Sequence, residues 1–114
     1  MTEPDAGTNT LAVRTTARQT SDSGGGYLLS GRKVWTSRLN HTDLVVVLAR
    51  TDGDPKAESD ESHGADRTAG LTLFLVDVRK AVAQTGAGAA VPFSMTPIRA
   101  EINHSSFEVV FDNL

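Results

Sequence analysis

The chain has 114 residues, a net charge of −3 and no cysteine. This length fits one domain, and the charge is not basic enough to suggest a nucleic-acid partner. Without cysteine there can be no disulfide, thiolate metal site or thiol nucleophile. The longest purely apolar run, residues 44–49, is far too short to cross a bilayer, so we expect no membrane insertion.

Short apolar and β-branched segments, separated by turn residues, predict a β-rich fold. Residues 1–10 form a loop by composition. A tight hairpin is expected at Ser30-Gly31. The expected strands are, in chain order, 11–19, 27–30, 32–37, 43–50, 71–77, 92–99 and 106–112. The predicted fold class is therefore all-β, an antiparallel barrel or two-sheet sandwich of about six to eight strands.

The second half of the chain contains the most apolar strands. Residues 43–50 and 71–77 are expected to be buried on both faces. Between them, the polar and acidic stretch of about 51–70 predicts a mobile loop. Residues 78–91 are ambiguous, because their alanines allow a short helical turn while their glycines and the following Pro92 favour a loop. No convincing amphipathic helix is predicted, and the apolar residues at 107, 109 and 111 are expected to share one face.

One predicted strand carries the only Trp of the chain. Because side chains alternate along a strand, Lys33, Trp35 and Ser37 are expected on one face, with Val34 and Thr36 on the other. A large flat ring beside a hydroxyl suits a core and also suits a planar polar ligand. Taken alone, a Trp on a strand is more often part of a core than a ligand contact.

The remaining polar residues do not form a recognisable catalytic or metal site. His41, His63 and His104 are scattered over predicted loops. The glycine runs at 24–26 and 86–88 lack the strand–turn–helix context of a phosphate or dinucleotide loop. We interpret them as turns.

The sequence TEPDAGTN at residues 2–9 and the sequence GRKVWTS at residues 31–37 occur in the order and spacing of two known motifs. They resemble the T-E-P-x-A-G-S-D loop and the G-x-K-x-W-I/T-T/S strand of the acyl-CoA dehydrogenase family, in its β-rich middle domain. Segments 49–52, 70–77 and 107–114 follow the same family pattern. The resemblance therefore covers nearly the whole chain.

This resemblance implies an FAD-dependent enzyme that oxidises the Cα–Cβ bond of an acyl-CoA thioester, with hydride transfer to flavin N5. Trp35 would pack against the isoalloxazine ring, Thr36 would contribute backbone contact, and Ser37 would place its hydroxyl near N5. Thr2 would hydrogen-bond the pyrimidine side of the flavin. With Gly7, these residues form the expected cofactor-binding set: Thr2, Gly7, Trp35, Thr36 and Ser37.

The substrate-binding residue implied by the resemblance is Thr8, which stands where the family usually has the Ser that contacts acyl-CoA. Asn9 likewise replaces the usual Asp. The flanking helical domains of the family are absent from the chain, so the catalytic glutamate is expected outside it. We therefore predict no catalytic residue here and no activity for these 114 residues alone.

For the intact protein, the resemblance implies an electron-accepting flavoprotein as partner, a homo-oligomer, and a cytoplasmic location, or the mitochondrial matrix in a eukaryote. Two other functions remain open from the sequence. One is the same domain in an acyl-CoA oxidase or a related flavin monooxygenase. The other is a non-enzymatic β-sandwich that acts as a binding module.

Overall fold

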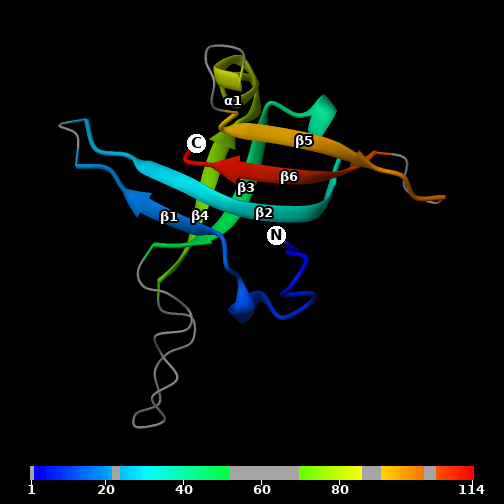
Figure 1. Cartoon of the computed structure of the whole chain (residues 1–114), viewed down its shortest axis with the longest axis horizontal. Helices are drawn as coiled ribbons and strands as arrows, with labels where there is room; N and C mark the ends of the chain where they lie inside the picture. The colour runs from blue at the N-terminus through cyan, green and yellow to red at the C-terminus, as the bar shows by residue number, and fades with distance from the viewer. Residues whose placement is uncertain (1, 22–23, 52–69, 86–90, 102–104) are drawn as a thin grey trace, which may run out of the picture.

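A six-stranded sheet with the strand order β4-β3-β1-β2-β6-β5 forms the fold (Figure 1). The structure, a computed structural model, describes residues 2–21, 24–51, 70–85, 91–101 and 105–114. The predicted loop of about 51–70 therefore lies almost wholly outside the described residues. The elements are η1 (Thr10–Ala12), β1 (Thr16–Gln19), β2 (Tyr27–Ser37), η2 (Leu39–His41), β3 (Leu44–Arg50), β4 (Leu71–Asp77), α1 (Val78–Thr85), β5 (Phe93–Ile98) and β6 (Ser106–Asp112).

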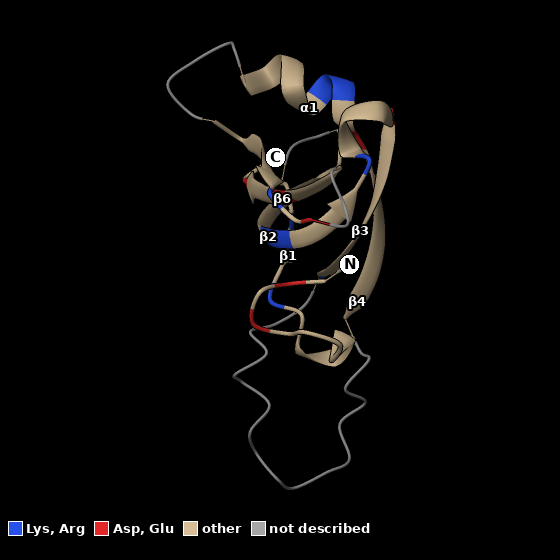
Figure 2. Ribbon diagram, turned by 90° about the vertical axis from the view of Figure 1, so that its right-hand side faces the viewer, with Lys and Arg blue, Asp and Glu red and all other residues tan. Residues whose placement is uncertain are grey.

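The sheet bends so that β3 and β4 cross over β2 and β6 as a second layer (Figures 1 and 2). Strands β4 and β5 form the two ends of the described sheet, so it is not closed into a barrel. The expected β-sandwich is confirmed. The prediction of a purely antiparallel sheet is wrong at one place, because β1 and β3 pair in parallel where Thr16 meets Arg50.

The core lies between these layers. On β6, Phe107, Val109 and Phe111 are all buried, as their alternation predicted. Each buried Phe stabilises the fold by roughly 1.5–3 kcal/mol through removal of apolar surface from water. The other buried members of the core are Ala17, Leu29, Leu39, Val47, Ala49, Val76, Val78, Ala81 and Phe93.

Strand β2 is one continuous strand, so the hairpin predicted at Ser30-Gly31 is wrong. Gly31 has φ +153°, and a Cβ built on it would lie 2.5 Å from Thr15 Oγ1 and 2.7 Å from Thr15 Cα. The glycine therefore permits a close approach of two chain segments and not a turn. The first predicted strand is shorter than expected, since residues 10–12 form η1, where Asn9 Oδ1 accepts a hydrogen bond from the Leu11 N–H at 3.2 Å.

Strands β3 and β4 each bury one face only, so the prediction of burial on both faces is wrong. Val47, Ala49 and Val76 face the core. The side chains of the other face remain exposed by half or more, because no described element covers them: Leu44 (50%), Val46 (50%), Leu73 (61%) and Leu75 (66%). An apolar run in the sequence does not show whether one or both faces of the strand are covered by a neighbouring layer.

The ambiguous segment after β4 begins as a helix. Asp77 Oδ1 accepts a hydrogen bond from the Lys80 N–H at 3.0 Å, as an N-cap does. Val78 and Ala81 are buried against the core, so this short helix is amphipathic, contrary to expectation. Residues 86–90 lie outside the described part. No helix within the described ranges has the length and apolar character needed to span a membrane.

Candidate functional site

A β-bulge in β2 shapes the surface around the only Trp. Lys33 pairs with Val109 and Thr36 pairs with Phe107 on β6, so two residues, Val34 and Trp35, oppose one. Trp35 has φ +59°, in the left-handed region that residues other than glycine seldom adopt. Such local strain persists only where the surroundings hold it, and it is often found at functional sites.

The bulge changes which side chains share a face. Lys33 and Thr36 lie on the core side with their β6 partners, and Lys33 is only 3% exposed. Trp35 is turned outward and is 54% exposed, and Ser37 is also exposed. The predicted grouping of Lys33 with Trp35, and of Val34 with Thr36, is therefore wrong. Trp35 and Ser37 are both exposed, on either side of Thr36 in the chain.

The N-terminal loop folds back on itself before it reaches β1. The Gly7 N–H donates to the Glu3 carbonyl at 3.3 Å, and Gly7 has φ +54°, which explains the glycine. Ala6 is buried and anchors the loop, whereas the side chains of Thr2 and Thr8 are exposed. The side chains predicted to contact the flavin (Thr2) and the acyl-CoA (Thr8) are therefore accessible to solvent.

A backbone hydrogen bond joins this loop to the bulge. The Val34 N–H donates to the Thr2 carbonyl at 2.9 Å, immediately before Trp35. The structure therefore brings Thr2 beside the strand that carries Trp35, Thr36 and Ser37. Within the described ranges no hydrogen bond joins Thr8 directly to that strand.

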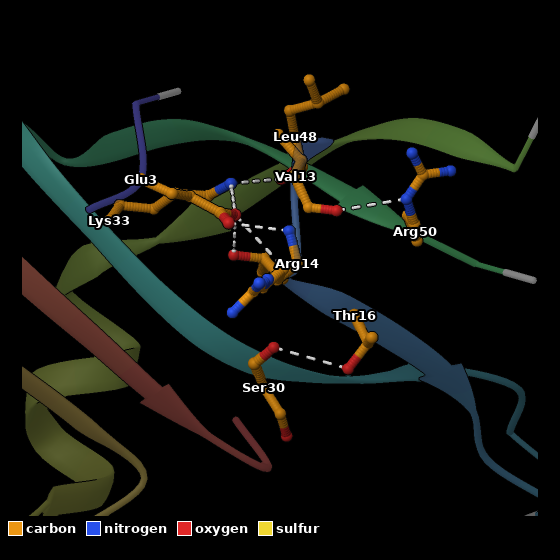
Figure 3. A network of polar contacts seen from close by, with 9 residues as sticks. Glu3, Val13, Arg14, Thr16, Ser30, Lys33, Leu48 and Arg50 are labelled. Carbon is orange, nitrogen blue, oxygen red and sulfur yellow. Dashed lines mark hydrogen bonds and ion pairs between the residues drawn. The ribbon is translucent and has the colours of Figure 1, made fainter. Parts of the chain in front are cut away.

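A buried ion pair joins Glu3 and Lys33, the residues next to Thr2 and Val34 in the chain (Figure 3). Lys33 Nζ donates to Glu3 Oε1 at 2.7 Å and to the Leu48 carbonyl of β3 at 2.6 Å. Glu3 also accepts hydrogen bonds from the Thr15 N–H at 3.0 Å and the Thr15 hydroxyl at 2.5 Å on Oε1, and from the Arg14 N–H at 2.7 Å on Oε2. Both charged side chains are nearly inaccessible, at 4% and 3% exposure.

The surroundings alter the ionisation of both partners. Burial raises the pKa of Glu3, but hydrogen bonds from Lys33, Thr15 and the backbone outweigh burial and hold it below 4.5. Burial lowers the pKa of Lys33, and the neighbouring carboxylate only partly offsets this. The carboxylate of Glu3 is therefore strongly held in its charged form at neutral pH.

Sequence reasoning missed Glu3 and Lys33, because charged residues in a loop and on a half-exposed strand are usually solvated. A signal was present. Both letters, the E of the loop motif and the K of the strand motif, belong to the two matching family patterns. The contact between Lys33 and Glu3 links the two motifs physically.

A separate pocket of about 280 Å³ lies at the opposite end of β2. Tyr27, Phe74, Lys80 and Leu114 are among its lining residues, and Trp35 is not. Among the described residues, no group of three or more His, Cys, Asp or Glu side chains is arranged to hold a metal ion.

Comparison with known proteins agrees with this architecture. The family described as "Acyl-CoA dehydrogenase, middle domain" matches residues 1–113. The chain is 41% identical over 76 residues to "Acyl-CoA dehydrogenase FadE34" of Mycobacterium tuberculosis, covering 67% of this chain and 9% of that protein. It is 32% identical over 96 residues to "Acyl-CoA dehydrogenase FadE26" of the same organism, covering 84% of this chain and 19% of that protein.

A solved structure of glutaryl-coenzyme A dehydrogenase in complex with glutaryl-CoA superposes with a TM-score of 0.68 at 27% identity. The match covers 98% of this chain and 23% of that one. The chain thus spans less than a quarter of each of these proteins. The order of its motifs, its sandwich and its match over residues 1–113 show that it belongs to the acyl-CoA dehydrogenase family, as the middle domain.

Proposed function

We propose that this chain covers one face of FAD in an enzyme that dehydrogenates acyl-CoA thioesters at Cα–Cβ. The observation that supports this most is the exposed ring of Trp35 on a strained β-bulge. The bulge is held next to Thr2 by the hydrogen bond from the Val34 N–H to the Thr2 carbonyl. FAD, when bound, supplies the hydride acceptor at N5. The chain's own residues bind and orient the reactants and exclude water.

The described residues fit a planar, polar cofactor. Trp35 offers an aromatic surface that is 54% exposed, and water leaves such a surface favourably when a flat ring covers it. The side chains of Thr2 and Ser37 are exposed, and each carries a hydroxyl. Thr36 points to the core side, so its contact with a cofactor would come from its backbone.

The substrate side of the proposal rests on the N-terminal loop. Gly7 gives the loop its turn, and Thr8 follows with an exposed side chain. We assign Gly7 to the cofactor and the Thr8 hydroxyl to the acyl-CoA, in keeping with family membership. For the whole protein we propose homo-oligomers and an electron-accepting flavoprotein as partner.

Titration of the 15N-labelled chain with FAD, followed by NMR up to millimolar concentration, tests the cofactor site. Trp35 supplies the only indole N–H signal of the chain. We expect shifts at Trp35, Thr36, Ser37 and Thr2, and we expect them to weaken in Trp35→Ala. Tyr27→Ala is the matched control, since Tyr27 is a 45% exposed aromatic residue at the other end of β2.

Two outcomes would argue against the proposal. If no resonance around the bulge shifts at millimolar FAD, the chain is better explained as a non-enzymatic binding module. If Trp35→Ala binds FAD as well as Tyr27→Ala does, Trp35 is not the flavin wall. In the intact enzyme, fast reoxidation by oxygen would identify an oxidase or monooxygenase in place of a dehydrogenase.

A further inference from the structure

We propose that the buried contact between Lys33 and Glu3 is a positioning device for the flavin and substrate surfaces. It holds the strand that presents Trp35 and the loop that presents Thr2 and Thr8 in one fixed arrangement. This inference rests on the proposed function for its purpose, but its structural content concerns only residues of this chain.

Glu3 acts as the anchor of the N-terminal loop. One side chain accepts hydrogen bonds from Lys33, from the Thr15 N–H and hydroxyl, and from the Arg14 N–H, all within 3.0 Å. A buried carboxylate with this many donors is fixed in position and direction. The loop before β1 is therefore fastened at its third residue to the segment that follows it.

Lys33 connects this anchor to both layers of the sandwich. Its backbone belongs to β2, and its ammonium group reaches Glu3 and the Leu48 carbonyl of β3 (Figure 3). Three hydrogen-bond donors on one group can satisfy partners on separate segments, which an apolar side chain cannot do. The loop, β2 and β3 thus meet at one nitrogen.

Two consecutive residues of β2 bind two consecutive residues of the loop. The Lys33 side chain contacts the Glu3 side chain, and the Val34 N–H donates to the Thr2 carbonyl at 2.9 Å. Trp35 comes next, in its left-handed conformation. The two contacts hold the bulge on its N-terminal side, and the pairing of Thr36 with Phe107 holds it on the other.

The use of charge here favours a positioning role over stability alone. Burying an ion pair costs desolvation, and apolar residues of similar size often stabilise a core as well or better. Directional hydrogen bonds fix one register, and a register error in this strand would redirect Trp35. Gly31 adds to the same arrangement by letting Thr15 approach β2 closely.

The test compares Lys33→Met with Lys80→Met, the same substitution at a lysine whose side chain is 81% exposed. In the folded, flavin-free chain, Lys33→Met should change the emission and acrylamide quenching of Trp35. It should speed hydrogen exchange of the Val34 N–H by roughly tenfold or more, because removing one partner of a buried pair opens the region locally. Lys80→Met should change neither.

If Lys33→Met does not fold, Glu3→Gln replaces it, because the amide keeps an acceptor oxygen and removes the charge. We expect changes at Trp35 and Val34 in the same direction. Wild-type values for both residues in a folded Lys33→Met or Glu3→Gln chain would overturn the positioning role.

Adding FAD separates this inference from the proposed function. If wild type responds to FAD, Lys33→Met should respond more weakly and Lys80→Met equally. If wild type does not respond at all, the proposed function fails, while the exchange and quenching data still decide whether Lys33 positions Trp35.

Discussion

Lys33 Nζ lies 2.7 Å from Glu3 Oε1, thirty positions apart in the chain, and both side chains are at most 4% exposed. The pair joins a loop that sequence composition describes only as polar to a strand that was predicted from its β-branched and aromatic residues. The surface we propose for FAD is built on this junction.

The first prediction concerns the stability that this pair supports. Lys33→Met should lower the free energy of unfolding by about 3–5 kcal/mol, because it leaves the Glu3 carboxylate buried without its counter-charge. Lys80→Met, which removes an exposed pair with Asp77, should cost about 0–1 kcal/mol. Urea unfolding at neutral pH measures both. An equal decrease in the free energy of unfolding in the two variants would show that the buried pair contributes no more to stability than the exposed pair.

The second prediction concerns acid. The folded-state pKa of Glu3 lies below 4.5, so in the acid range the unfolded chain binds the extra proton more readily than the folded chain does. The stability that the ionised Glu3 carboxylate contributes is complete above pH 4.5, and it is lost as the pH falls through the lowered pKa. Glu3→Gln lacks it, so the stability difference between wild type and Glu3→Gln should narrow below pH 4.5. Denaturant unfolding at stepped pH would contradict this if the difference stayed constant.

The sequence predicted most strands of this fold, because their residue types and separating turns are local properties. The bounds of β4 and β6 match well, and the period of two along β6 identified its buried face. The family motifs also singled out both segments that meet at the candidate site. All of these features are determined by the local sequence of one segment.

The predictions that were wrong concern features that depend on a second segment of the chain. The bulge at Val34 and Trp35 breaks the alternation that the face assignment assumed, and it is defined only by the register with β6. Gly31 looked like a turn residue, but its role is set by Thr15, which lies just before β1. Burial of Glu3 required knowing that Lys33 would lie beside it. Such pairings between distant positions cannot be read from local composition.

The third prediction concerns Gly31. Gly31→Ala should destabilise the chain by about 1–3 kcal/mol, because the new Cβ would meet Thr15 at 2.5 to 2.8 Å and the φ of +153° is unfavourable for alanine. Gly26→Ala is the control. A Cβ added at Gly26 would lie 3.5 Å from Thr20 Oγ1, which is an ordinary van der Waals contact. Thermal unfolding of both variants should therefore separate them clearly, and similar midpoints would show that the close approach of Thr15 is easily relieved.

The fourth prediction concerns the outer face of β3 and β4. Figure 2 shows these two strands with no charged residue along most of their length. Leu73 and Leu75 lie on β4, at the end of the sheet, and are 61% and 66% exposed. An apolar strand at a sheet edge promotes association between chains. Replacing both leucines with threonine should therefore reduce concentration-dependent self-association of the 114-residue chain.

Stability should change little in this double variant, because threonine suits a strand and the two side chains are not part of the core. Val76→Thr is the control on the same strand, since Val76 is 9% exposed and faces the core. It should lower the unfolding midpoint and leave association undiminished. Sedimentation velocity over a range of concentrations measures association. If the double leucine variant associates as strongly as wild type, then another surface of the chain causes the association.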